Sequence, residues 1–309
     1  MPSNLDKRIK TSLDETRLLI LGAQVLLGFQ FQSFFQDGFS ELSPLSKHLC
    51  IFGLESTILA IVFFVVPSME HRLVEKGRST SRLIAATNFH TALGLAPLAL
   101  SLTISSYVVI SRHFGTLAGL IGGLGLGIIS GFAWFGFEYL IGLASEKDPM
   151  QQAQTPLATK IDQMLTEARV IIPGAQALFG FQFVVMLTTG FDRLPQTSKV
   201  MHAIALGLIA VNVVLLMMPA ALHRLSYRGE DCAEFLCIGS ALVIAAPLLL
   251  AGGIATETYV VIHKVIDDVA WSAVGACATL AVIVLCWYAL PLVLKHAPAQ
   301  KNHAPALSQ

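Results

Sequence analysis

The amino-acid sequence is written twice, and this duplication restricts the fold more than any other feature. The segment that begins at Glu15 returns at Glu167, and 11 of its first 17 positions are identical in the two copies. The same offset of 152 residues carries Pro67 onto Pro219 without a gap. Short solenoid repeats have periods of about 20–50 residues, so a period this long indicates a duplicated domain. We therefore expect two related structural units.

Long apolar runs fill both copies. The chain is 54% hydrophobic and 13% charged, with a mean hydropathy of +0.68, whereas soluble domains carry roughly 25% charged residues. The runs approach or exceed the ~20 residues that a helix needs to cross a bilayer, and the alternation of a barrel strand is not present. We predict an all-helical integral membrane protein. Its predicted spans are 18–35, 48–67, 83–110 and 116–143 in the first repeat, and 170–189, 200–219, 235–262 and 269–294 in the second.

The distribution of Lys and Arg predicts the orientation. With the N-terminus inside, fifteen of the 20 basic residues fall on the inner side; the other five are Lys47, Arg112, Arg193, Lys199 and Lys264. This positive-inside bias places both termini in the cytoplasm. Four spans per repeat give both repeats the same orientation. We therefore expect two parallel four-helix repeats related by a pseudo-twofold axis along the membrane normal.

A polar interval marks the joint between the repeats. It covers 144–166, and we interpret it as a cytoplasmic linker that includes the start of a second interfacial helix. The first repeat is then 1–143, the second is 167–294, and 295–309 is a cytoplasmic tail.

An amphipathic segment precedes the first span of each repeat. Three residues spaced by four lie on one helical face, which is typical of a short helix lying on the inner leaflet. The two trios are Ile9, Leu13 and Arg17, and Ile161, Leu165 and Arg169. We also expect Pro67 and Pro219 to end the second and sixth spans, because proline is best tolerated at a helix end.

Three short patterns recur in both copies: Glu-x-Arg, Gly-Ala-Gln-x-x-x-Gly-Phe-Gln and Pro-x-x-x-His-Arg-Leu. Together they resemble an uncharacterised bacterial family of small four-span membrane proteins, a domain of unknown function. The resemblance covers residues 9–143 and 161–294. It implies a bacterial inner-membrane location and a fusion of two units that elsewhere occur singly. It implies no activity.

Glutamines recur inside the first span of each repeat. Gln24 and Gln30 return as Gln176 and Gln182. An amide in hydrocarbon needs a partner, because an unpaired polar group there costs several kcal/mol. These side chains either join neighbouring helices by hydrogen bonds or line a polar cavity.

Glu55 breaks the repeat symmetry, since its counterpart is Gly207. An ionisable side chain inside a span is a candidate functional site. A cavity shared by Glu55, His90 and Asn212 would suit a cation or a proton. The alternatives are that Glu55 reaches outer water or Lys47, and that His90 is a packing residue. The remaining polar candidates within the spans are Asn88, Glu138 and Glu257.

A charged cluster recurs at the cytoplasmic boundary. Its members are Glu15, Arg17, His71 and Arg72 in the first copy, and Glu167, Arg169, His223 and Arg224 in the second. We interpret the cluster as ion pairs that hold the first and second spans of each repeat together. The alternative is a gate whose ion pairs break and reform during transport.

Glycines at a spacing of four mark the fourth span. They are Gly115, Gly119, Gly123, Gly127 and Gly131. Such a stripe permits close helix packing, either with a neighbour in the same chain or in an oligomer. At the offset of 152, the second copy keeps only Gly275, opposite Gly123.

Known catalytic motifs do not occur: the sequence contains no Walker loop, nucleophile elbow, HExxH or dinucleotide fingerprint. The five cysteines have no paired spacing, and we expect free thiols and no metal site. We predict no enzyme activity, no cofactor and no nucleic-acid partner. The lipid bilayer is the predicted partner, and a homo-oligomer or a larger membrane complex is left open.

Three functions remain at this stage. The leading one is binding or passage of a small polar solute or ion through a cleft between the repeats. The alternative is a non-catalytic structural or accessory subunit of a membrane complex. The third is a haem or quinone redox protein, in which the symmetric pair His71 and His223 would bridge the halves.

Overall fold

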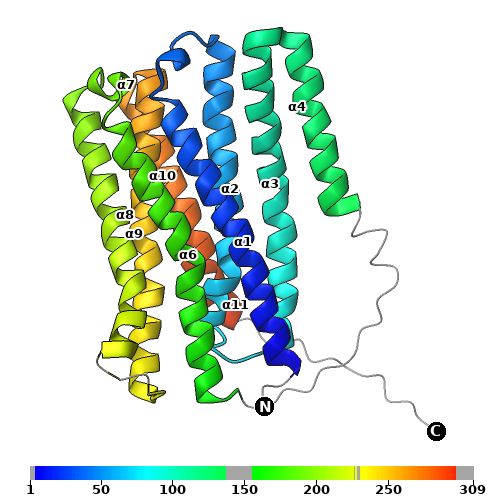
Figure 1. Cartoon of the computed structure of the whole chain (residues 1–309), viewed down its shortest axis with the longest axis vertical. Coiled ribbons are helices and arrows are strands. Elements are labelled where there is room, and N and C mark those ends of the chain that lie inside the picture. The colour runs from blue at the N-terminus through cyan, green and yellow to red at the C-terminus, as the bar shows by residue number, and fades with distance from the viewer. Residues whose placement is uncertain (1–3, 137–154, 226, 228–229, 297–309) are drawn as a thin grey trace.

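The long apolar runs of the sequence fold into long helices, which lie side by side in the computed structural model (Figure 1). The structure describes residues 4–136, 155–225, 227 and 230–296. Every regular element in these residues is helical and none is a strand, which confirms the all-helical part of the predicted fold class.

Each repeat contributes four long helices with short helical turns between them. The first repeat has α1 (Asn4–Ser33), the 3₁₀ turn η1 (Asp37–Phe39), α2 (Pro44–Leu73), α3 (Ser81–Phe114), α4 (Thr116–Gly131) and the π-helical turn η2 (Phe132–Gly136). The second has α6 (Leu157–Val185), α7 (Thr189–Asp192), α8 (Gln196–Leu225), α9 (Ala233–Ile266), α10 (Val269–Val284), the π-helical turn η3 (Leu285–Ala289) and α11 (Leu290–His296).

Local signals in the sequence set the starts of several helices. The side chains of Ser43 and Thr80 accept hydrogen bonds from backbone N–H groups in the first turns of α2 and α3. Such caps satisfy donors that have no partner within the helix. Gly115 adopts a φ of +87° between α3 and α4, a conformation that glycine adopts without steric cost. These two helices consequently form a tight hairpin.

The helix bounds repeat along the chain with one change of offset. α8 and α9 begin and end 152 residues after α2 and α3, whereas α10 begins and ends 153 residues after α4. The extra residue lies in the α9–α10 turn, where Asp267 and Asp268 replace the single Gly115. Gly275 is therefore the counterpart of Gly122, and the sequence-based alignment with Gly123 was wrong by one residue.

Two expectations about helix ends differ from the structure. The amphipathic segments are not separate interfacial helices, because each continues without a break into the apolar part of α1 or α6. Pro67 and Pro219 lie inside α2 and α8, which continue for six more residues to Leu73 and Leu225. The extension carries His71 and Arg72 on a rigid helix.

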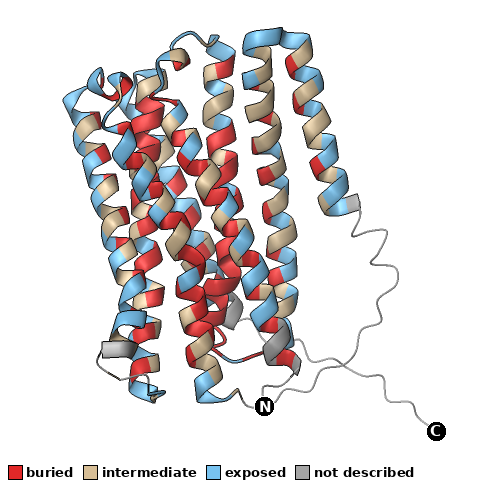
Figure 2. Cartoon of the chain, viewed as in Figure 1, coloured by how far each residue is buried: buried red, intermediate tan, exposed pale blue. Residues whose placement is uncertain are grey.

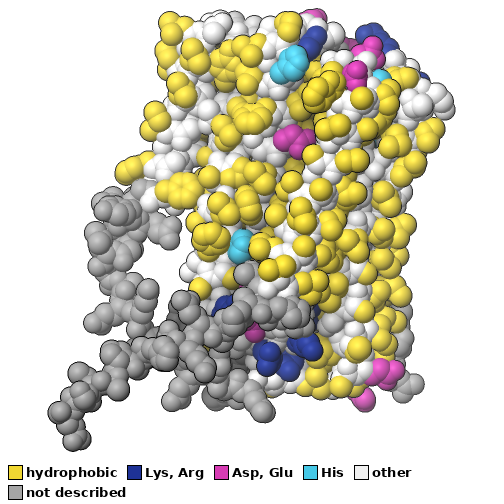
Figure 3. Space-filling model, turned by 180° about the vertical axis from the view of Figure 1, so that it is seen from behind, with side chains coloured by type: hydrophobic (Ala, Val, Ile, Leu, Met, Phe, Trp, Pro, Cys, Tyr) yellow, Lys and Arg dark blue, Asp and Glu magenta, His cyan; other side chains and the backbone are white. Residues whose placement is uncertain are grey.

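Seven helical segments of the described residues are long and apolar enough to cross a membrane. They are Pro44–Leu73, Ser81–Phe114, Thr116–Phe135, Leu157–Val185, Gln196–His223, Ala233–Ile266 and Val269–Val293. α1, which contains the first predicted span, is not among them, and Gln24, Gln30 and Gln32 lower the hydropathy of its apolar half. Hydrophobic side chains cover most of the wall seen in Figure 3, and charged side chains gather near the two ends.

The core lies where the two repeats meet. α1 runs along α6 at the centre of the bundle, and buried residues concentrate on these helices and on α2 (Figures 1 and 2). The end of the second repeat crosses to the first: Trp287 in η3 donates a hydrogen bond from Nε1 to the carbonyl oxygen of Val62 on α2, at 3.0 Å. α4, by contrast, packs on α3 at the edge of the bundle.

Candidate functional site

A buried polar network lies between α6, α8 and α9 of the second repeat. His202 Nδ1 lies 3.0 Å from Glu257 Oε1, and the Gln182 amide donates to Glu257 Oε2 at 3.1 Å. The three residues are 0–2% exposed. His202 Nε2 lies 3.0 Å from the Gln182 carbonyl oxygen, which can only accept. Nε2 therefore carries a hydrogen, and the contact between Nδ1 and the Glu257 carboxyl group needs a second proton.

Aromatic rings close this network toward the end of the bundle. The rings of Phe191 and Phe35 lie 5.1 Å and 6.3 Å from the His202 ring, centroid to centroid. Phe35 belongs to the loop after α1, so the first repeat covers a polar site of the second. The His202 and Glu257 side chains pair with each other, and within this network only Gln182 Oε1 is buried without a partner among the described residues. This packed arrangement favours a structural role.

The matching position in the first repeat is built differently. At the offset of 152, Gln30, Cys50 and Ser105 replace Gln182, His202 and Glu257. The Gln30 amide donates to Ser101 Oγ at 2.8 Å and to Ser105 Oγ at 3.3 Å. Its carbonyl oxygen, Oε1, is buried and has no hydrogen-bond partner among the described residues. Gln182 Oε1 of the second repeat is likewise unpaired, so the two repeats differ in the side chains around the glutamine and not in this acceptor.

A cavity of about 400 Å³ opens beside Gln30, between α1, α2, α3 and the loop that follows α1. Gln30, Cys50 and Ser105 line it together with apolar walls that include Phe34. At its rim, Arg112 donates to the Gly38 carbonyl oxygen at 2.8 Å and contacts Glu41 at 2.6 Å. The volume lies within the range of about 300–1,000 Å³ that is typical of small-molecule sites. We call this space the first-repeat cavity.

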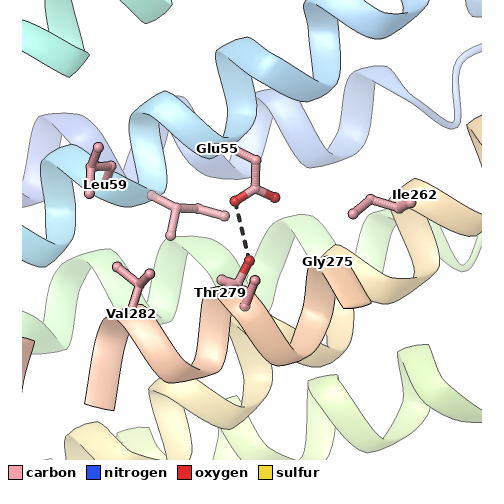
Figure 4. A pocket seen from close by; sticks show the side chains of 8 residues that line it. Glu55, Leu59, Ile262, Gly275, Thr279 and Val282 are labelled. Atoms are coloured by element: carbon pink, nitrogen blue, oxygen red, sulfur yellow. Dashed lines mark hydrogen bonds between the residues drawn. The ribbon is translucent and has the colours of Figure 1, made fainter. Parts of the chain in front are cut away.

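Glu55 occupies a different pocket, on the outside of the contact between α2 and α10. Thr279 Oγ1 donates to Glu55 Oε2 at 3.2 Å, and the other carboxyl oxygen is buried without a described partner (Figure 4). The pocket measures about 350 Å³, and its remaining lining is apolar, including Leu59 and Ile262. Glu55 therefore contacts Thr279 of the second repeat. It does not pair with Lys47, which was one of the alternatives.

The other polar candidates do not join Glu55. Lys47 bonds the Ser40 carbonyl oxygen. His90 bonds the Ala86 carbonyl oxygen of its own helix, as the packing interpretation expected. Asn88 is exposed on α3. Asn212 is buried on α8, and neither of its amide atoms has a partner among the described residues. Glu138 lies outside the described residues.

The first-span glutamines do not behave as a pair. Gln24 is fully buried and occupies the space beside Gly174, where an added Cβ would lie 1.4 Å from Gln24 Oε1. Gln176 is exposed, and Gly22, the counterpart of Gly174, has nothing within 4 Å of an added Cβ. The two repeats thus share a sequence motif and make only one of the two possible contacts.

Among the described residues the charged cluster forms once, and it joins the repeats. Glu167 of α6 pairs with both His71 and Arg72 of α2, and all three are buried. Arg72 also reaches Ser240 Oγ of α9, at 3.3 Å. The expectation that each cluster locks one repeat was wrong, because α6 lies against α2 of the other copy at this level.

The remaining members of the predicted cluster lie elsewhere. Glu15 and Arg169 are exposed, and Arg17 is half-buried. His223 stacks on Phe235 and lies 3.5 Å from Asp231. The side chain of Arg224 falls outside the described part of the chain. His71 and His223 are therefore engaged by carboxylates at separate places and do not face each other as a ligand pair.

The glycine stripe of α4 packs partly on α3 of the same chain. An added Cβ would lie 2.6 Å from Ser111 Cβ at Gly119, 2.9 Å from the Thr103 carbonyl oxygen at Gly123 and 2.6 Å from Thr103 Oγ1 at Gly127. At Gly115 and Gly131, nothing lies within 4 Å. Three of the five glycines therefore permit the close contact of α4 with α3, whereas Gly131 makes no such contact and Gly115 serves the turn between the two helices.

His202 and Glu70 were not among the residues predicted from the sequence. His202 lies at the start of the predicted span 200–219. A titratable side chain within an apolar run could have marked it as a candidate. Glu70 lies beyond Pro67, where the helix was expected to end; it is 1% exposed and lies 3.4 Å from Arg82. The five cysteines are free thiols. No group of three potential metal ligands occurs within the described residues.

Comparison with known proteins identifies the duplication. The model of a family described as "Family of unknown function (DUF6328)" matches residues 2–138 and again residues 152–291. No curated protein and no solved structure matches the chain.

Proposed function

The chain belongs to this family of unknown function, and we propose from the geometry of its first repeat that it is a multi-pass membrane protein which binds a small amphipathic solute in the first-repeat cavity. One observation carries the proposal. The second repeat fills the equivalent position with His202 and Glu257, whereas the smaller Cys50 and Ser105 of the first repeat leave a cavity beside the unpaired Gln30 acceptor.

The lining defines the class of solute. Gln30 Oε1 accepts hydrogen bonds, so the bound group carries an O–H or N–H donor. The walls are largely apolar, which suits a hydrocarbon or aromatic body. Arg112 at the rim already pairs with Glu41, and a neutral solute leaves that pair intact.

The contact between the repeats favours binding over passage. Gln24 occupies the space beside Gly174, and Phe181 lies against Gly28 on α1, where an added Cβ would be 2.0 Å from its ring. A path between α1 and α6 would have to part these contacts. The proposal therefore retains the binding of a solute and gives no role to a central cleft.

We infer the membrane arrangement from the paired helices. α1 has 30 residues, about 45 Å at 1.5 Å per residue, and it runs along α6. We therefore propose α1 as an eighth span, because its own counterpart α6 is a candidate span. Eight spans, the charge bias and the repeat together support two parallel four-helix units about a pseudo-twofold axis, with both termini cytoplasmic. The resemblance of the sequence to a bacterial family supports an inner-membrane location.

The test uses two probes that differ by one hydrogen-bond donor, 4-hexylphenol and 4-hexylanisole. Cys50 lines the cavity, so in a variant with the other four cysteines replaced by serine its alkylation by N-ethylmaleimide reports occupancy. We expect the phenol to protect Cys50 about tenfold more tightly than the anisole, since a hydrogen bond to a buried acceptor contributes about 1–1.5 kcal/mol.

Variants sharpen this test. Ser105→Phe fills the cavity and should abolish protection, while Leu93→Phe adds the same ring to an exposed position of the same helix and should not. Equal protection by both probes, or protection that survives Ser105→Phe, would remove the cavity as a binding site.

A scaffold role is the second candidate. The closed α1–α6 contact favours it, together with the position of α4 at the edge of the bundle, where Leu117, Ile121 and Ile128 are exposed. Native mass spectrometry in detergent would show a stable oligomer or a bound subunit if α4 makes such a contact. A monomer that keeps its fold and binds 4-hexylphenol would favour the solute-binding proposal.

A further inference from the structure

A cavity of about 540 Å³ lies at the other end of α2 and α3 from the first-repeat cavity. It is formed by the α2–α3 loop, the start of α3 and the start of α6. We call it the basic pocket, and its lining residues are Val74, Glu75, Lys76, Arg78, Arg82 and Lys160. Four of these six carry a positive charge and one carries a negative charge.

Hydrogen bonds fix the loop that builds the pocket. The Ser79 N–H donates to Thr155 Oγ1 at 2.9 Å, and the Gln163 amide donates to Ser79 Oγ at 3.2 Å. Ser79 and Gln163 are 4% and 2% exposed. These bonds tie the α2–α3 loop of the first repeat to the start of the second. Lys160 of α6 is therefore held opposite the basic side chains of the loop.

The backbone of the loop is held in an uncommon conformation. Lys76 has a φ of +51° and Gly77 a φ of +74°. A residue with a Cβ pays a steric cost in this left-handed region. The stem of Lys160 packs over Gly77, with its Cγ 3.5 Å from the position of an added Cβ. The surrounding contacts therefore hold Lys76 in place despite that cost.

The positive charges of the pocket are only partly neutralised. Arg82 lies 3.4 Å from Glu70, and Arg78 donates from Nε to the Glu75 carbonyl oxygen at 3.1 Å. Among the described residues, no hydrogen bond or ion pair engages the ammonium groups of Lys76 and Lys160. The pocket thus presents two unpaired cations beside two guanidinium groups.

We propose that the basic pocket binds a phosphate group, carried either by a lipid headgroup or by a soluble phosphate compound. Lys and Arg are the residues that bind phosphate, by charge and by hydrogen bonds. The pocket lies at helix ends on the side with the excess of Lys and Arg. Basic pockets there meet the anionic headgroups of the inner leaflet.

The experiment titrates the full chain, purified in neutral detergent, with two probes: phosphatidylglycerol and inorganic phosphate. The shift of the unfolding midpoint gives an apparent affinity for each, because a ligand that binds only the folded state raises the midpoint. Phosphatidylcholine, which has no net charge, serves as the lipid control. We expect a saturable shift with at least one of the two anionic probes.

Two double variants each remove two positive charges from the same end of the bundle. Lys76→Gln with Lys160→Gln empties the pocket of its unpaired cations. Arg17→Gln with Arg169→Gln changes half-buried and exposed positions outside it. The first pair should weaken binding about 30-fold, which corresponds to about 2 kcal/mol, and the second less than threefold.

Each outcome decides the proposal. A shift with phosphatidylglycerol alone assigns the lipid headgroup, and a shift with inorganic phosphate assigns a soluble ligand. If neither probe gives a saturable shift, or if the two double variants weaken binding equally, the proposal of a phosphate site in the basic pocket is wrong. Lys160→Arg keeps the charge and should retain binding, so it separates a lost cation from a damaged fold.

Discussion

The carboxylate of Glu167 and the guanidinium of Arg72 meet inside the bundle, although the two residues belong to different repeats. Glu167 is 0% exposed and Arg72 is 5% exposed. His71 contacts the same carboxylate, so one buried negative charge is shared by two neighbours of α2. The pair ties α6 to α2 across the repeat boundary.

Glu167→Ala should lower the free energy of unfolding by about 3–5 kcal/mol, because removing one partner leaves a buried guanidinium unpaired. Glu15→Ala, at the exposed counterpart, should change it by less than about 0.5 kcal/mol. Denaturant unfolding of both variants in the same detergent measures the difference. Similar losses in the two variants would contradict a single buried pair.

Glu257 and His202 should show strong energetic coupling. A double-mutant cycle with Glu257→Ala and His202→Ala should give an interaction energy of at least about 1 kcal/mol, since the two side chains contact each other in a buried site. The control cycle uses His263 and Asp267, which lie 3.8 Å apart with Asp267 exposed, and should give about 0–0.5 kcal/mol. Thermal or denaturant unfolding gives the free energies for both cycles. An interaction energy no larger than that of the control would contradict a coupled network.

Gly123→Leu should destabilise the protein more than Gly275→Leu. An added Cβ at Gly123 would meet a backbone carbonyl oxygen, whereas at Gly275 it would meet the flexible tip of Ile262, at 2.2 Å. Overpacking costs about 1–3 kcal/mol, with the larger values where the backbone must move. Gly131→Leu is the matched control, because nothing lies within 4 Å there. Loss of stability in Gly131→Leu equal to that in Gly123→Leu would contradict the contact with α3.

Glu55→Gln should preserve the fold within about 0.5 kcal/mol, because the amide keeps an oxygen that accepts from Thr279. Its pocket is otherwise apolar, so Glu55→Leu should be neutral or stabilising by about 1 kcal/mol. The unfolding midpoints of both variants test this. In reconstituted vesicles, wild type and Glu55→Gln should have equal ion and proton permeability, and a drop in the variant would restore Glu55 as a transport residue.

The two ends of the bundle should label from opposite sides. A membrane-impermeant maleimide should reach Ser40→Cys, near η1, from outside, and Thr155→Cys, before α6, only from inside. Both positions lie in segments between long helices. Thr155→Cys removes the hydroxyl that accepts from the Ser79 N–H, so unfolding of this variant is measured alongside the labelling. Labelling of Thr155→Cys from outside would reverse the predicted orientation.

The amino-acid sequence determined the helices and their repetition. Apolar runs, the caps Ser43 and Thr80 and the turn at Gly115 are local signals, so they could be read without knowledge of neighbours. The continuation of α2 beyond Pro67 could not, since buried contacts around His71 and Arg72 override the tendency of proline to end a helix.

Only the tertiary structure decided which polar residues meet. Gln24 and Gln176 are equivalent in sequence, yet one is buried beside Gly174 and the other is exposed. Glu167 pairs with Arg72, whereas Glu15 is exposed on the surface of the protein. Partner choice depends on how α6 packs against α1 and α2, and this contact lies between residues about 100–150 positions apart. Two copies of one motif therefore acquired different surroundings, and a single sequence carries no record of that difference.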